Sequence, residues 1–242
     1  YPFIDIAVHP RVREHFARGE ALVLFSADLA RALWANGAGA ELFGHSAVYD
    51  LQDQGVNRGD ITYRQLEVTA RQLSRIGDTR NFIIRIAQGF QRVAVQASVE
   101  LIDVSGEPAV LVSLPVATRA LSTEQSAAQM LKGLDDPDTH MAVIGGEGEI
   151  VAASPGFASL GVTQPTAKAL ATMAGAHPHG LIKRPVATGK GYLPAAVGRI
   201  SAEAGLYLLF AVETVLGRLD ATDAPDLSTS PVNHIAATPA PD

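Results

Sequence analysis

Two histidines separated by one proline, His177 and His179, have the spacing in this chain that most resembles part of a metal site. Two imidazole rings can hold a transition metal when further ligands complete its coordination shell. Aspartates and glutamates occur in the surrounding sequence, but no spacing fixes any of them beside the histidines. We therefore interpret the pair as part of a loop and predict no metal site.

Two glycine-rich stretches have some features of phosphate-binding loops. Gly189-Lys190 lacks both the earlier glycine and the following Ser or Thr of a P-loop, because Arg184 and Gly191 stand at those positions. The stretch from Gly145 to Gly148 contains part of a dinucleotide fingerprint, which must open a helix. A strand is predicted after it here, so we interpret both stretches as turns between strands.

The composition and motifs of the chain exclude cysteine chemistry and give no support for a serine hydrolase. The chain has no cysteine, which rules out disulfides, thiolate metal sites and cysteine nucleophiles. It also has no Gly-x-Ser-x-Gly elbow, the motif of a common class of serine hydrolases. We predict no catalytic residue, and we do not expect this fragment to be an enzyme.

The charge and hydropathy of the chain limit the kinds of partner that we expect for it. The 242 residues carry 19 Lys and Arg against 25 Asp and Glu, a net charge of −6, whereas nucleic-acid binding usually needs a basic field. No apolar run reaches the ~18 residues of a membrane span. The chain begins at Tyr1 and shows no signal-peptide pattern. We predict a cytoplasmic piece of a longer protein, without a nucleic-acid partner or a membrane span.

The middle of the chain has the clearest pattern of secondary structure. Apolar residues alternate with others through three runs, Phe82 to Ile86, Val93 to Leu101 and Val110 to Val116. A period of two is typical of strands with one buried face. Turn residues separate the runs, which predicts an antiparallel meander.

The residues before the meander predict a flanking helix, two strands and three short helices. Pro10 and Gly19 favour a helix at 10–18, since proline suits the first helical position and glycine the stop. The strands are predicted at Leu22–Phe25 and Ala32–Ala35, and the short helices at 37–43, 46–52 and 61–76.

The same order begins again after a helix expected at 122–134, where Ser122 and Gln125 have capping-box spacing. The second series comprises strands at 142–144 and 150–153, short helices around 157–160 and 165–174, and strands at 180–187, 192–200 and 206–213. The half-length of this repeat, about 100 residues, is the usual size of a small domain.

These patterns divide the chain into five parts. They are a flanking segment with a helix at 1–20, a first domain at 21–118, a linker helix at 119–137, a second domain at 138–216 and a tail at 217–242. The tail contains four prolines and no aromatic residue, a composition typical of a disordered linker.

The element order is that of a PAS domain, and the residues from Phe25 to Gly44 resemble the opening of one. There a strand ends in an Ala-Asn pair, here Ala35-Asn36, and a short helix ends in Leu-aromatic-Gly. Gly146 to Gly161 resembles the same opening, with Ser154 in place of the asparagine. The resemblance implies an α+β fold of two PAS-like domains, each an antiparallel sheet with short helices on one face.

The resemblance departs from many PAS domains at the end of each last strand. There an Asp-x-Thr junction couples the domain to the next helix. Here the corresponding residues are Pro115-Val-Ala-Thr118 and Val212-Glu-Thr214. Neither stretch carries the aspartate.

The residues Leu33-Trp34-Ala35-Asn36 also resemble the sensory region of alphaproteobacterial cell-cycle histidine kinases of the PleC, DivJ and PdhS group. This resemblance implies a sensory and dimerisation region that regulates a kinase module in the DivK pathway, with DivK as a response-regulator partner. The chain lacks a phospho-acceptor helix and an ATP-lid pattern, so the kinase would be the full-length protein. The alternative is a scaffold of PAS domains that binds proteins but no ligand.

Trp34, Tyr63 and Arg85 are the residues that we expect to border a ligand pocket in the first domain. A small apolar pocket with a few polar groups is the usual site for a small molecule. The alternative is that both rings fill the core and Arg85 faces solvent.

No cofactor is predicted. Flavin photosensors of this fold use a cysteine for the adduct, and the chain has none. Haem sensors of this fold use a histidine on the helix before the meander, and residues 60–76 contain none. His45 is a weak substitute, which we interpret as a surface residue.

Val8, Val12 and Phe16 are the candidates for a dimer contact. They place apolar surface on the flanking segment, whose short helix is not stable alone in water. PAS-like units commonly lay such a helix against a second copy, and two-fold pairing is the commonest symmetry, so a homodimer is predicted. The alternative is that Val12 and Phe16 cover the open side of their own sheet.

Overall fold

The structure, a computed structural model, describes residues 2–88, 91–117, 119–134 and 136–213. The predicted tail at 217–242 and the last three residues of the predicted second domain lie outside these ranges. Within the described ranges, no helix has the length and apolar character needed to cross a membrane.

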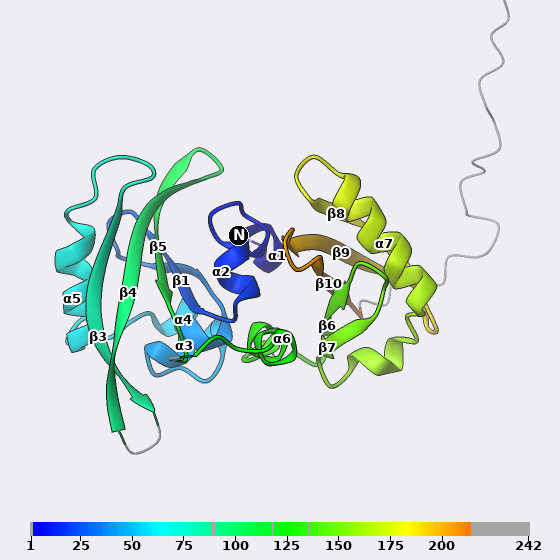
Figure 1. The fold of residues 1–242 in the computed structure, drawn as a ribbon, viewed down its shortest axis with the longest axis horizontal. Coiled ribbons are helices and arrows are strands. Elements are labelled where there is room, and N and C mark those ends of the chain that lie inside the picture. Colours follow the sequence, from blue (N-terminus) through cyan, green and yellow to red (C-terminus); the bar gives the residue numbers. More distant parts are fainter. Residues whose placement is uncertain (1, 89–90, 118, 135, 214–242) are drawn as a thin grey trace, which may run out of the picture.

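Each half of the chain forms a five-stranded antiparallel sheet, and the two sheets have the same strand order (Figure 1). The first sheet has the order β2-β1-β5-β4-β3 and the second β7-β6-β10-β9-β8. The strands are β1 (Ala21–Ser26), β2 (Ala32–Ala35), β3 (Thr79–Gln88), β4 (Gln91–Val104), β5 (Glu107–Leu114), β6 (Thr139–Gly145), β7 (Ile150–Ala153), β8 (Leu181–Thr188), β9 (Gly191–Ser201) and β10 (Leu206–Val212). The predicted α+β fold of two PAS-like domains is confirmed.

Short helices cover one face of each sheet. The first domain has α3 (Gly37–Leu42), α4 (Val48–Gln54) and α5 (Ile61–Ala70), and the second has the 3-10 helix η1 (Phe157–Leu160) and α7 (Gln164–Ala176). Helix α5 ends earlier than predicted. The carboxylate of Asp78 accepts hydrogen bonds from the backbone N–H groups of Ser74 and Arg75, which fixes a turn where the pattern predicts more helix.

The N-terminal segment forms two helices, α1 (Phe3–Ala7) and α2 (Arg13–Ala17), rather than the single helix predicted at 10–18. A turn separates them, in which the N–H groups of Val12 and Arg13 both donate to the carbonyl of His9. Pro10 lies in this turn, and its missing N–H and fixed φ disfavour a continuous helix across it.

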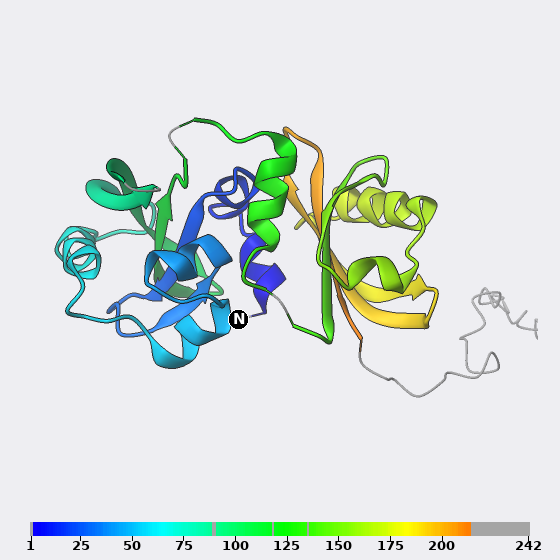
Figure 2. The same ribbon diagram turned by 90° about the horizontal axis from the view of Figure 1, so that it is seen from below.

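Helices α1, α2 and α6 (Thr123–Leu131) lie between the two sheets (Figures 1 and 2). Helix α2 contacts both β1 and β9, and α6 contacts β6, β7 and α3. The predicted capping box of Ser122 and Gln125 begins α6. One hydrophobic cluster therefore extends from the first sheet through these helices to residues of the second sheet such as Ile200 and Leu208.

The three dimer candidates are buried inside this middle layer of a single chain. Val12 and Phe16 are fully buried, and Val8 packs on β9, where Gly198 leaves room for it. A Cβ on Gly198 would lie 2.2 Å from a methyl carbon of Val8. These side chains cover sheets of their own chain, so in this structure they are not available to a second copy. The homodimer stays a prediction that needs another surface.

Candidate functional site

Trp34 is buried on the face of the first sheet that packs against the N-terminal helices. Its ring lies near those of Phe3 and Phe16, with centroid distances of 5.1 and 6.3 Å. Its Nε1 donates a hydrogen bond to the carbonyl of Phe3 at 3.1 Å. The polar group of this side chain is therefore satisfied by its own chain.

Tyr63 is buried on the other face of that sheet. Its hydroxyl donates to the carbonyl of Leu29 at 3.0 Å, and its ring lies 6.4 Å from that of Phe25. On β1, Leu24 pairs with Trp34 and Phe25 is the next residue. Because successive residues of a strand point to opposite faces, Phe25 and Tyr63 lie on the face opposite Trp34. Arg85 is exposed on β3, at the opposite edge of the sheet from β2. The structure does not bring the three predicted pocket residues together.

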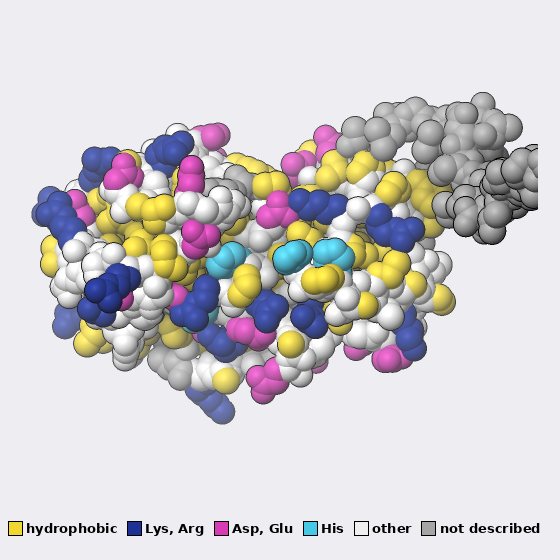
Figure 3. Space-filling model, turned by 90° about the horizontal axis from the view of Figure 1, so that it is seen from above, with side chains coloured by type: hydrophobic (Ala, Val, Ile, Leu, Met, Phe, Trp, Pro, Cys, Tyr) yellow, Lys and Arg dark blue, Asp and Glu magenta, His cyan; other side chains and the backbone are white. Residues whose placement is uncertain are grey.

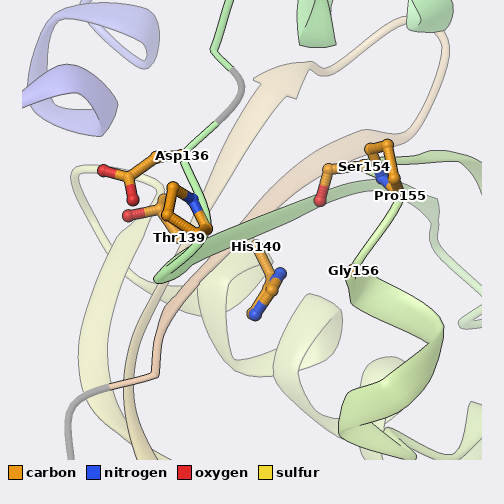
Figure 4. A pocket seen from close by; sticks show the side chains of 7 residues that line it. Asp136, Thr139, His140, Ser154, Pro155 and Gly156 are labelled. Atoms are coloured by element: carbon orange, nitrogen blue, oxygen red, sulfur yellow. The ribbon is translucent and has the colours of Figure 1, made fainter.

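The second domain has a cavity of about 300 Å³ where its first strand begins (Figure 4). In Figure 4 the ring of His140 points toward the backbone at Gly156, whereas the side chains of Asp136 and Thr139 point away from the ring. The residues that line the cavity are Asp136, Pro137, Thr139, His140, Ser154, Pro155 and Gly156.

Ser154 holds one side of this cavity in place. Its backbone N–H donates to the carbonyl of Met141 at 2.8 Å, and its Oγ accepts from the N–H of Met141 at 3.0 Å. Asn36 makes the same pair of contacts with Leu22 in the first domain, at 3.1 and 2.9 Å. The predicted equivalence of Ser154 and Asn36 is confirmed.

The His140 side chain is the candidate recognition group of the cavity. The residue is 6% exposed, and its Nε2 lies 3.0 Å from Oε2 of Glu213. Because a carboxylate accepts hydrogen bonds, Nε2 carries the hydrogen shared with Glu213, and Nδ1 is an acceptor whenever the ring holds only that hydrogen. Gly156 leaves space beside it, since a Cβ there would lie 2.4 Å from Nδ1.

Glu213 connects the cavity to the end of the last strand. Its Oε1 accepts from Nζ of Lys190 at 2.6 Å, and its N–H donates to the carbonyl of Asp138 at 2.7 Å. The hydrogen bonds from Lys190 and then His140 hold the pKa of the Glu213 carboxyl below its ordinary value. We call His140, Lys190 and Glu213 the exit cluster.

Sequence reasoning missed the exit cluster. The available signal was Val212-Glu-Thr214, which differs from Asp-x-Thr because its acidic residue is a glutamate and stands next to the threonine. The glutamate still places a carboxylate at the end of β10. His140 and Lys190 are distant in sequence, so no local pattern joins them to it.

The other predicted motifs lie in turns. His177 and His179 are exposed between α7 and β8, with ring centroids 5.9 Å apart. Among the described residues, no group of three or more histidine, aspartate or glutamate side chains is placed to hold a metal ion. The glycine-rich stretches form the β6–β7 and β8–β9 turns, as predicted.

Known proteins resemble this chain over most of its length. It is 34% identical over 209 residues, 86% of the chain, to the cell-division control histidine kinase PdhS of Brucella canis, of which it covers 20%. The PdhS of Brucella anthropi is 32% identical over 210 residues and is covered to 19%. The chain spans about a fifth of the length of these curated relatives. The predicted resemblance to this group of kinases is confirmed.

Two other comparisons with known proteins add little information about this chain. No protein-family model matches the chain. The PAS domain of an HTR-like protein from Haloarcula marismortui overlaps 46% of this chain and 89% of that domain, with 13% identity and a TM-score of 0.31. The PAS-like fold is inferred from the strand order of the two sheets.

Proposed function

We propose that this chain is the sensory region of a histidine kinase that takes part in cell-division control. The observation that carries the proposal is the 34% identity to PdhS over 209 residues, a match longer than either domain alone. It supports a two-domain input unit shared as a whole with those kinases. The chain itself carries no catalytic residue in this proposal.

The second domain is the proposed sensing element. A small molecule in the cavity would meet Nδ1 of His140, which accepts a hydrogen bond, so the proposed ligand carries a hydrogen-bond donor. Movement of the ring would change its contact with Glu213, the last described residue. A ligand that favours one arrangement of the exit cluster would shift the packing of the segments that follow.

The remaining parts of the proposal come from the resemblance. The whole protein would act in the cytoplasm as a homodimer and pass phosphate to a response regulator such as DivK. No flavin or haem is proposed, so the purified chain should be colourless. An absorption band at about 400–450 nm would contradict this part.

The test measures autophosphorylation of the full-length protein that carries this region. We expect His140→Gln and Glu213→Gln each to change the rate severalfold, because each removes a contact of the exit cluster. His177→Gln, an exposed histidine of the same domain, is the matched control and should leave the rate unchanged. Variants that behave as wild type would contradict the proposed coupling. The isolated chain should incorporate no labelled phosphate above a buffer control.

The ligand-free scaffold remains a second candidate, and one observation favours it. The polar groups of the two aromatic residues of the predicted pocket, Nε1 of Trp34 and the hydroxyl of Tyr63, are bonded within the first domain and its flanking segment. A thermal-shift screen with metabolites separates the candidates, since a ligand of the folded state raises the melting temperature. A shift that Gly156→Ala abolishes supports the cavity, and a screen without shifts supports the scaffold.

A further inference from the structure

An apolar groove runs between α5 and β3 of the first domain, with a volume of about 480 Å³. Three aliphatic side chains on its rim, Ile61, Val68 and Ile83, are 73, 64 and 66% exposed. Exposed apolar side chains that cluster beside polar ones are typical of interaction sites. The residues that line the groove are Ile61, Arg64, Gln65, Val68, Thr69, Phe82 and Ile83.

The segment that forms the groove is basic, although the whole chain is acidic. Residues 58–85 contain six arginines against three carboxylates, in a chain whose net charge is −6. Figure 3 shows Lys and Arg side chains gathered with hydrophobic ones at the end of the molecule that carries α5 and β3. Arg64 lies in the groove itself.

Most of these arginines have no acidic partner in the described part of the chain. There, Arg71 pairs with Glu67, whereas the other five make no ion pair. The five are Arg58, Arg64, Arg75, Arg80 and Arg85. Their positive charge is therefore available to a partner.

The nearby carboxylates are engaged with backbone groups or with Arg71. Asp60 begins α5 by accepting from the N–H of Thr62 at 2.7 Å. Asp78 accepts from the N–H groups of Ser74 and Arg75 at 2.9 and 3.0 Å. These contacts engage both carboxylates in local turns, and of the five arginines without an ion pair, Arg80 is the one whose charge acts on Asp78.

We propose that the groove between α5 and β3 binds an acidic segment of a partner protein, in which aliphatic side chains alternate with carboxylates. Its aliphatic side chains would pack on Ile61, Val68 and Ile83, and its carboxylates would meet Arg64 and the neighbouring arginines. A second copy of this groove is disfavoured as the partner because like charges would face each other. The aliphatic rim gives no stacking platform for bases, which disfavours nucleic acid.

The test uses the whole chain and a phage-displayed library of random dodecapeptides. Wild type should enrich peptides that contain Asp or Glu together with Leu, Ile, Val or Phe. A synthetic peptide of an enriched sequence should bind wild type and bind Arg64→Glu about tenfold more weakly. Its affinity should also fall as salt rises, since exposed charges are screened.

Matched controls keep the result interpretable. Arg184→Glu makes the same charge change at an exposed arginine of the second domain, outside the groove, and should bind the peptide as wild type does. Val68→Ser should also weaken binding, because it removes an apolar contact while α5 keeps its charge. Both groove variants must melt as wild type does. If either unfolds, Ile83→Ser replaces it, since that exposed side chain lies on β3.

Three outcomes overturn the proposal. The first is a selection without acidic, aliphatic peptides. The second is binding that Arg64→Glu and Arg184→Glu weaken equally. The third is duplex DNA or vesicles of anionic lipid that bind the groove more tightly than the selected peptide does. This inference does not depend on the kinase role, so failure of either leaves the other standing.

Discussion

Asn36 in the first domain and Ser154 in the second stand at equivalent junctions, yet the two junctions leave different amounts of space. The Asn36 side chain accepts from the N–H groups of Leu22 and Gly39 and donates to the carbonyl of Glu20. It thereby fixes the strand, the following helix and the preceding segment together. The hydroxyl of Ser154 is shorter and accepts from Met141. The cavity beside His140 lies at this second junction.

This difference indicates a division of roles between two domains of the same topology. A fold alone does not determine function, which depends on the groups that a site presents. The first domain and its flanking segment together satisfy the polar groups of Trp34 and Tyr63. The second presents a ring nitrogen to a cavity and connects that ring to Glu213. Substitutions at the two junctions test this division of roles.

We expect the largest effect from Asn36→Ser, which replaces the asparagine of the first junction with the serine found at the second. Asn36 is fully buried, so the buried N–H of Gly39 and the partly buried carbonyl of Glu20 lose a partner. Each such loss costs about 1–3 kcal/mol, and we expect the free energy of unfolding to fall by ~3 kcal/mol. Urea unfolding followed by circular dichroism measures it. Asn81→Ser, at an exposed residue of β3, is the control; an equal loss there would refute the argument.

Gly156→Ala tests the open junction with a smaller effect. The φ of −82° at Gly156 suits any residue, so the cost comes from the new Cβ, which would lie 2.3 Å from Cε1 of His140. We expect a loss of ~1–3 kcal/mol, as in other overpacked sites, and a shifted His140 ring signal in NMR. Gly146→Ala adds a Cβ whose nearest contact is 4.0 Å away, and it should change neither quantity. An unchanged His140 signal in Gly156→Ala would contradict the geometry.

Ser154→Ala should have a smaller effect than Asn36→Ser. It removes one side-chain hydrogen bond, from the N–H of Met141, and keeps the backbone contact between the same two residues. We expect a loss of ~1 kcal/mol in urea unfolding. A loss as large as that of Asn36→Ser would mean that the two junctions are equally closed, and the comparison would fail.

The smallest effect concerns pH. Since the folded state lowers the pKa of Glu213, its contribution to stability is present above the ordinary glutamate pKa, about 4.3, and is lost as pH falls through the lower folded value. The melting temperature of wild type should exceed that of Glu213→Gln at neutral pH. This difference should shrink below about pH 4. A difference that persists in acid would show that the charge of Glu213 does not stabilise the exit cluster.

The regular parts of the fold could be predicted because their patterns are local. Alternation from Phe82 to Val116 identifies three strands, and Ser122 with Gln125 identifies the start of α6. The end of α5 depends on a side chain, Asp78, that lies beyond the helix. The apolar residues of the N-terminal segment predict that it packs against another surface. No local pattern shows that this surface is formed by the two sheets of the same chain.

The candidate site was harder to predict because its residues are distant from one another in the sequence. The contact between His140 and Glu213 joins residues that are 73 positions apart. The cavity also depends on the side chain that Gly156 lacks, and glycine is common in turns for its backbone freedom alone. The residues chosen from the sequence, Trp34 and Tyr63, were chosen for their size and polarity, which also suit a filled core.

The middle layer has a consequence for synthesis on the ribosome. Glu14 accepts a hydrogen bond from Ser201, a residue made 187 positions later. At ~5–20 residues per second, the N-terminal helices wait roughly 10–40 s for that partner strand. During this interval the apolar surface of α1 and α2 that later meets β9 lacks that partner, which predicts that chaperones bind the nascent chain. Slowing translation within the second domain should lengthen this exposure and lower the yield of folded protein.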